Sequence, residues 1–136
     1  MPRLSFAVCC QSSSIDSRTN NVSLFHILEQ IQASAFPATF PFLEIVTLWE
    51  RESDHVESFT LRIRLLDPQG LQLGTQEIPV RMDQARQRVF ASIHGVPFPT
   101  PGRYTFEVSI QHQAQEAWLV YASIPLILEH GPPVRE

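Results

Sequence analysis

The feature that most constrains this fold is a pair of alternating runs joined by a turn, Leu61-Arg-Ile-Arg-Leu-Leu-Asp-Pro-Gln-Gly-Leu-Gln-Leu73. Its apolar positions 61, 63, 65, 71 and 73 are all odd, so they share one face of a hairpin only if the loop has an odd number of residues. Residues 68–70 fit, with Pro68 in the second position of a type I turn and Gly70 in the left-handed position after it. The stretch predicts an antiparallel β protein.

Several other segments alternate in the same way. The clearest is Arg103–His112, where the inward positions are Tyr104, Phe106, Val108 and Ile110. Further strands are predicted at Leu4–Gln11, Phe42–Arg51, Arg88–His94 and Ala117–Glu129. Residues 22–31 fit both a helical stripe and a strand, and their predicted neighbours favour a strand.

The segments between these strands are read from proline, glycine and polarity. Prolines predict loops at Phe36–Pro41 and Gly95–Gly102, and residues 82–87 could hold a short helical turn. After Gly74 the apolar positions become even, which predicts a bulge near Gly74–Thr75. Pro79 places its strand at the edge of a sheet.

The length and strand spacing together indicate the architecture. A chain of 136 residues with 43% hydrophobic content can bury one core, so we expect a single domain over residues 1–130 and a flexible tail at 131–136. Roughly seven or eight short strands without a secure helix predict an all-β, antiparallel β-sandwich, immunoglobulin-like or a related Greek key. A small barrel is the alternative.

Two resemblances follow from these motifs. Pro101-Gly-Arg-Tyr104 looks like the start of a late strand in immunoglobulin-like domains, where a tyrosine hydroxyl bonds to upstream backbone. The order of elements resembles a family of small bacterial β-sandwich proteins of uncharacterised function, with a first strand ending in Cys, an apolar Val22–Ile31 strand, a hairpin with Asp-Pro-x-Gly and a closing Pro-Gly-x-Tyr-x-Phe. This resemblance implies a fold and transfers no active site.

Charge and composition limit the classes of partner. A net charge of -4 and a pI near 5.7 give no basic surface for nucleic acid. The chain has no lysine, which removes lysine chemistry, and no apolar run long enough to span a membrane. Cys9 and Cys10 are adjacent, so we expect free thiols, one in the core and one outward, and a cytoplasmic location.

No residue spacing indicates catalysis. The histidines are scattered, the aspartates fall in separate turns, and no phosphate-binding loop, catalytic motif or metal-ligand spacing occurs. Arg62 and Arg64 could clamp an acidic partner, although a solvated outer face is the simpler interpretation. We therefore expect no enzyme activity, no metal and no cofactor.

Two strands fail to alternate. Residues 117–128 and 22–31 are apolar on both faces, so each would expose an apolar surface unless a loop or another protein covers it. The candidate interaction surface consists of Phe25, Ile27, Leu119, Tyr121 and Ile127.

These observations favour a non-catalytic β-sandwich that acts through protein association, either by self-assembly as a homo-oligomer or as an accessory subunit. One alternative is a small-ligand or carbohydrate-binding module that uses Trp118 and Tyr121. A second is an enzyme whose site cannot be read from the sequence.

Overall fold

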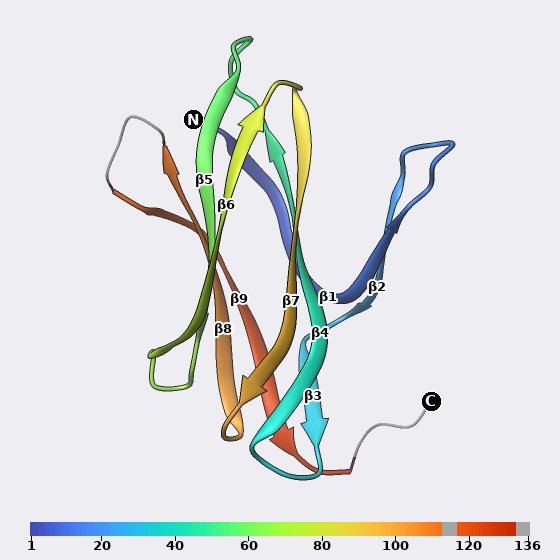
Figure 1. The fold of residues 1–136 in the computed structure, drawn as a ribbon, viewed down its shortest axis with the longest axis vertical. Coiled ribbons are helices and arrows are strands. Elements are labelled where there is room, and N and C mark those ends of the chain that lie inside the picture. Colours follow the sequence, from blue (N-terminus) through green and yellow to red (C-terminus); the bar gives the residue numbers. More distant parts are fainter. Residues whose placement is uncertain (113–116, 133–136) are drawn as a thin grey trace.

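A computed structural model describes residues 1–112 and 117–132, which form nine strands and no helix (Figure 1). Within this described part, no helix is long and apolar enough to cross a membrane. The strands are β1 (Arg3–Ile15), β2 (Val22–Ile27), β3 (Gln30–Ala33), β4 (Ala38–Glu50), β5 (Glu57–Leu66), β6 (Gln72–Met82), β7 (Arg86–Phe98), β8 (Gly102–His112) and β9 (Leu119–His130).

The strands form two packed sheets, which confirms the predicted β-sandwich. Sheet A has the order β2-β1-β4-β7, and sheet B has the order β3-β9-β8-β5-β6. Neighbouring strands are antiparallel except for β3 and β9, which pair in parallel. The sequence indicated seven or eight strands and did not show the parallel pair.

The core lies between the sheets and is formed by residues that alternate along the strands. Tyr104, Phe106, Val108 and Ile110 of β8 are fully buried, as predicted. From sheet A, Trp49 faces them, and its indole N–H donates to the Thr47 hydroxyl at 2.8 Å. Burial of these large side chains is the main stabilising term of the domain.

The predicted hairpin forms with the expected three-residue loop. The N–H of Gly70 donates to the carbonyl of Asp67 at 2.9 Å, and Gly70 has a φ of 85°. The register then shifts because Leu66 pairs with Gln72 and Leu65 with Gly74, which leaves Leu73 as the extra residue of a bulge. The bulge was predicted one residue later. Leu71, predicted to face inward, lies in the turn before β6 and is 67% exposed.

Prolines interrupt the strands less than predicted. Ala38 to Pro41, expected to be loop, belongs to β4, and its ladder pairs Phe40 with Val96 and Phe42 with His94 on either side of Pro41. Similarly, β7 continues through Pro97, because an edge strand tolerates a missing N–H on its free side. The proposed helical turn is also absent, since β6 ends at Met82 and β7 begins at Arg86.

Residues 22–31 are neither a helix nor one strand. They form β2 in sheet A and the start of β3 in sheet B, so the chain changes sheets at residues 28–29. The strand interpretation was right in kind but wrong in extent. The sandwich extends to the end of β9 at His130, and most of the predicted tail at 131–136 lies outside the described residues.

The corner before β8 has the geometry that the resemblance implied. The Tyr104 hydroxyl donates to the carbonyl of Thr100 at 2.6 Å and accepts from its N–H at 3.2 Å. Gly102 has a φ of 142°, and a Cβ there would lie 2.6 Å from Cγ of Pro68. The β5–β6 turn and the β7–β8 corner therefore pack directly on each other.

Candidate functional site: the β1–β2 arm and its free edge

The second half of β1 and all of β2 form an arm that projects from the sandwich (Figure 1). The two strands pair from Cys10 with Ile27 to Ile15 with Val22. The turn at the tip is closed by Asp16, whose Oδ1 accepts the N–H of Arg18 at 2.8 Å and that of Thr19 at 3.2 Å. This is an Asx-type turn, in which a side chain replaces a backbone acceptor.

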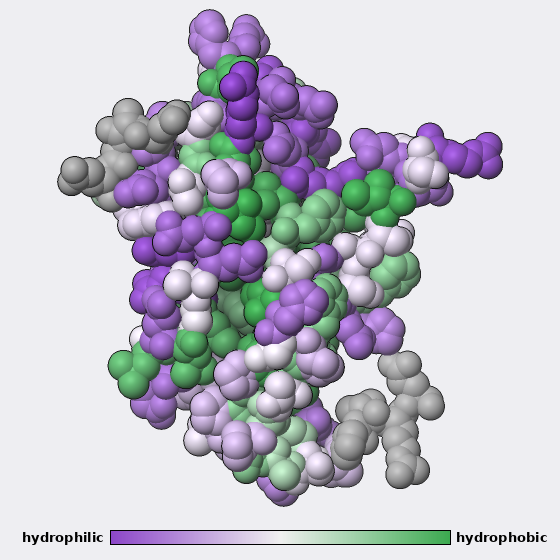
Figure 2. Space-filling view, in the orientation of Figure 1, coloured by the Kyte–Doolittle hydropathy of each residue, from purple (hydrophilic) through white to green (hydrophobic). Residues whose placement is uncertain are grey.

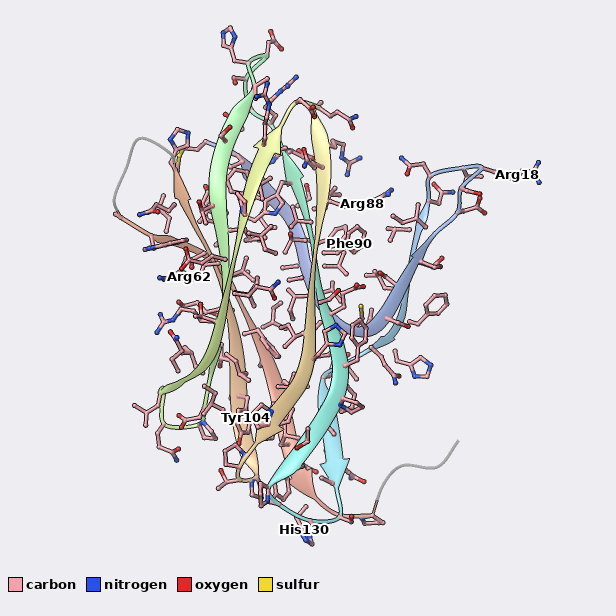
Figure 3. All side chains as sticks on the ribbon, in the orientation of Figure 1. Arg18, Arg62, Arg88, Phe90, Tyr104 and His130 are labelled. Atoms are coloured by element: carbon pink, nitrogen blue, oxygen red, sulfur yellow. The ribbon has the colours of Figure 1, made fainter. Side chains whose placement is uncertain are left out.

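Polar contacts hold the arm at both of its ends. At the tip, the Arg88 guanidinium of β7 donates to the carbonyl oxygen of Asn20 at 2.6 Å. At the base, the Ser13 hydroxyl bonds to Glu44, which also accepts from Ser92 at 3.4 Å. Arg88 and Phe90 point from β7 toward the arm (Figure 3). These hydrogen bonds hold the arm beside β4 and β7, although the arm itself packs on little of those two strands.

A groove of about 530 Å³ lies between the arm and the outer face of sheet A. Its apolar lining residues are Phe6, Ile15, Val22, Leu48 and Phe90. Arg86 and Arg88 also line the groove. The outer face of a sandwich sheet is usually polar. The apolar character of this outer face is visible in the sequence of β4, where Val46 and Leu48 alternate with the core residues.

The free edge of β2 lacks the charges and prolines that commonly prevent edge strands from pairing with other chains. Residues 19–28 contain no charged residue, proline or glycine. Phe25 is 46% exposed and Ile27 is 58% exposed. The regular part of the strand ends at His26, which has a φ of 56°. An apolar, uncharged edge of this kind presents unpaired N–H and C=O groups to any extended segment.

The other three edges each have such protection. Strand β6 carries Glu77, Pro79 and Arg81 together with the bulge at Leu73. Strand β7 carries Gly95 with a φ of 63° and then Pro97. Strand β3 has only four residues. Charges, prolines, bulges and shortness all discourage edge pairing, and β2, whose only such features are its six-residue length and the positive φ of His26, has fewer of them than β6 and β7.

The structure divides the predicted interaction surface. Ile27 and Ile127 line one shallow groove with Ile124 and Arg103. Phe25 lies on the arm, and Leu119 lies at the opposite end of β9 from Ile127, paired with Ile110. The five predicted residues do not form one continuous surface.

Tyr121, one of the five predicted surface residues, is partly buried and packs against the core. Its ring centroid lies 5.3 Å from that of Trp49, and its hydroxyl donates to the carbonyl of Pro2 at 3.0 Å. Burial raises its pKa, with a smaller contribution from nearby carboxylates. Tyr121 is the extra residue of a bulge, because Val108 pairs with Ala122 and Ser109 with Val120.

That bulge explains most of the apolar excess in β9. Before it, the odd residues Leu119 and Tyr121 lie on the core side, and after it the even residues Ile124, Leu126 and Leu128 do. Two core-facing sets of opposite parity look like two apolar faces in the sequence. The outward apolar residues that remain are Val120, Pro125 and Ile127, with Trp118 beneath Arg62.

The other residues considered for chemistry are engaged in local contacts. The Arg62 guanidinium lies 4.1 Å from the centroid of the Trp118 ring, and Arg64 bonds to Glu107 at 3.0 Å. Among the residues that the structure describes, no three His, Cys, Asp or Glu side chains gather as metal ligands would.

Both cysteines are free and buried, whereas one was expected to face outward. Burial raises the pKa of Cys9 to about 12. Burial, and then the nearby Glu44 carboxylate, also raise the pKa of Cys10. The thiolate is the nucleophilic form, so both thiols are poorly reactive at neutral pH.

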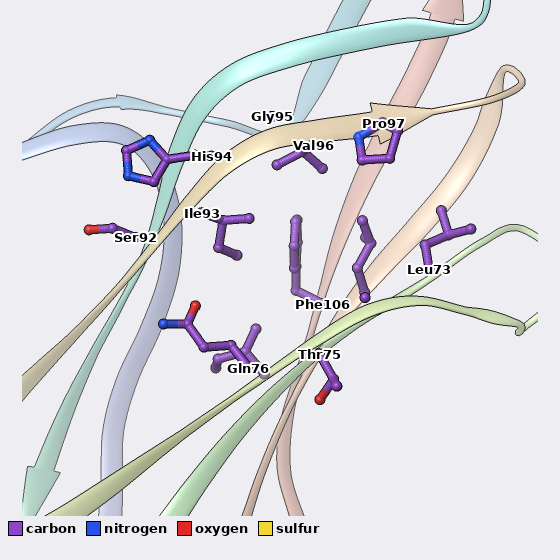
Figure 4. A pocket seen from close by; sticks show the side chains of 13 residues that line it. Leu73, Thr75, Gln76, Ser92, Ile93, His94, Gly95, Val96, Pro97 and Phe106 are labelled. Carbon is purple, nitrogen blue, oxygen red and sulfur yellow. The ribbon is translucent and has the colours of Figure 1, made fainter.

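A second cleft, of about 360 Å³, opens between the edge strands β6 and β7. Figure 2 shows hydrophobic side chains between these strands, and Figure 4 shows Phe106 at the centre, near Ile93 and Val96. His94, the one titratable residue among those that line it, has its ring 5.0 Å from that of Phe42. The cleft is a seam onto the core without a set of groups suited to catalysis.

Comparison with known families gives one match. Residues 5–122 match the model of a family of unknown function, DUF6941, and the chain belongs to this family. The match covers the arm and most of both sheets. No curated protein matches the chain in sequence.

Proposed function

We propose that this DUF6941 member is a non-catalytic binding domain that acts by associating with another polypeptide through the free edge of β2. In this mode an extended segment adds to the sheet as a further strand, and backbone hydrogen bonds supply much of the affinity. The observation that carries the proposal is that β2 is uncharged and free of proline, unlike β6 and β7, that it is longer than the four-residue β3, and that it exposes Phe25 and Ile27.

The arm suits this role because it places the edge away from the sandwich. The outer side of β2 has no neighbouring strand in sheet A, so an added strand meets no steric obstacle from the sheet itself. The contacts of Arg88 and Glu44 fix the arm before binding, which lowers the entropic cost of association.

Carbohydrate binding is less well supported. Trp118 stacks with Arg62, and Tyr121 contacts Trp49 and Pro2, so both aromatic residues of that hypothesis have intramolecular partners.

Site-specific photo-crosslinking in cells that express the chain tests the proposal. A photoreactive phenylalanine analogue replaces Phe25 on the arm, and the same analogue replaces Leu71 as a matched control, since Leu71 is an exposed apolar residue beside a protected edge. We expect protein adducts at position 25 in several-fold excess over position 71. Equal yields at the two positions, or adducts at position 71 alone, would contradict the proposal.

A further inference from the structure

We infer that the segment added to β2 is β2 of a second copy of this chain, in antiparallel orientation. This inference rests on the proposed function and identifies the partner of the same edge. The result would be a dimer in which the two four-stranded sheets A join into one continuous sheet through their arms.

The charges at the two ends of β2 favour this partner and this direction. The uncharged stretch is bounded by Arg18 at the tip of the arm and by Glu29 after the end of β2. Both residues are exposed, and Figure 3 shows Arg18 at the tip, pointing away from the sandwich. Antiparallel pairing of two copies brings each Arg18 beside the partner's Glu29, whereas parallel pairing would place Arg18 beside Arg18 and Glu29 beside Glu29. The Asp16 carboxylate at the same tip is engaged within the turn by the N–H groups of Arg18 and Thr19.

Symmetry gives a second reason for self-pairing. An edge that pairs with itself about a two-fold axis satisfies both copies at once and leaves no β2 edge open. In an antiparallel pairing centred near Leu24, each Leu24 lies opposite its copy, and the two Phe25 residues become diagonal neighbours across the new strand pair. The protected β6, β7 and short β3 edges then limit growth beyond the dimer.

Sedimentation of the purified chain over a concentration series tests for the dimer. The variants are Phe25→Lys, which puts a charge on the edge, and Leu71→Lys, which puts the same charge on an exposed apolar residue outside it. We expect the wild type and Leu71→Lys to dimerise alike and Phe25→Lys to dimerise at least about tenfold more weakly. Thermal unfolding of each variant confirms that the fold is kept.

Spin labels test the orientation. Cysteine replaces Ser23 near the expected axis or Ser17 at the tip, and the buried Cys9 and Cys10 leave the new thiol as the reactive one. With a rise of about 3.3 Å per residue, antiparallel pairing puts the two Ser23→Cys labels close together and the two Ser17→Cys labels roughly 40 Å apart. Short distances for both pairs would overturn the antiparallel arrangement.

Charge reversal tests the complementarity of the two ends. We expect Arg18→Glu to weaken the dimer roughly two- to tenfold, because exposed ion pairs contribute little each, and the double variant with Glu29→Arg to restore it. Failure of the double variant to restore dimerisation would contradict the charge pairing.

The tests separate this inference from the proposed function. A strictly monomeric chain whose position 25 still crosslinks to a different protein overturns the inference and leaves the proposed function standing. A dimer that survives Phe25→Lys and shows no short Ser23→Cys distance overturns it as well, because its interface lies elsewhere.

Discussion

Hairpins β5–β6 and β1–β2 each include an edge strand, and each closes on an aspartate that accepts two backbone N–H groups. They differ in what their strands cover. Leu61 and Ile63 of β5 and Met82 of β6 are buried in the core, whereas past Cys10 the β1–β2 hairpin leaves the sandwich and most of its residues are partly or fully exposed. Similar local turn chemistry therefore closes a hairpin that is buried in the core in one case and a hairpin that projects from it in the other, and packing makes the difference.

Truncation of a buried leucine should change the free energy of unfolding more than any other substitution proposed here, and it tests that difference in packing. Leu61→Ala should lower the free energy of unfolding by about 2–5 kcal/mol, because Leu61 is fully buried and its truncation leaves a cavity. Leu24→Ala, the same change on the arm, should cost less than about 1 kcal/mol. Chemical denaturation of both variants measures the two values, and similar losses would show that the arm is part of the core.

The next largest effect on stability concerns Cys9, which lies beside the point where the pairing of β1 with β4 ends and the arm begins. This effect depends on pH. The folded pKa of Cys9 is raised from 9.0 to about 12, so the unfolded chain loses this proton first. Stability is therefore unaffected by Cys9 below pH 9 and falls by about 1.4 kcal/mol per pH unit between pH 9 and 12. Denaturation at several alkaline pH values should show this decline in the wild type, a smaller decline in Cys9→Ala, where Cys10 still contributes, and the flattest curve in the double variant Cys9→Ala, Cys10→Ala.

The smallest effect compares the two turn aspartates. Asp67→Ala removes the acceptor for the N–H groups of Gln69 and Leu71, and we expect it to cost about 1–2 kcal/mol. Asp16→Ala removes the same number of bonds at the tip of the arm, yet should cost less than about 0.5 kcal/mol, because the tip can open without global unfolding. Equal losses in denaturant titrations would mean that the arm and sandwich unfold together.

Much of the fold could be predicted because its signals are local. The loop at Pro68 to Gly70, the bulge beside it, and the inward set of β8 all follow from parity and turn chemistry within a few residues. Pro79 correctly indicated an edge, since a missing N–H excludes the centre of a sheet.

The rest depends on pairing that local sequence does not contain. No glycine or proline marks the bulge at Tyr121. In the sequence, the switch from odd to even core-facing residues along β9 therefore looks like a second apolar face. The sequence predicts a loop at 95–102, whereas Pro97 lies in β7, because the place of this strand on a sheet edge depends on the whole sheet order. The arm depends on the strand pairing for the same reason, since β1 pairs with β4 only as far as Cys10 and its later residues carry β2 and Phe25 away from the sandwich.

The close contact of Gly102 with Pro68 also has a consequence for how this sequence can diverge. A side chain at position 102 would collide with the proline ring, and it would have to adopt a backbone conformation that favours glycine. Family members that replace the glycine are therefore expected to have replaced the proline as well. The two positions, distant in the chain, should change together or remain fixed together over evolutionary time.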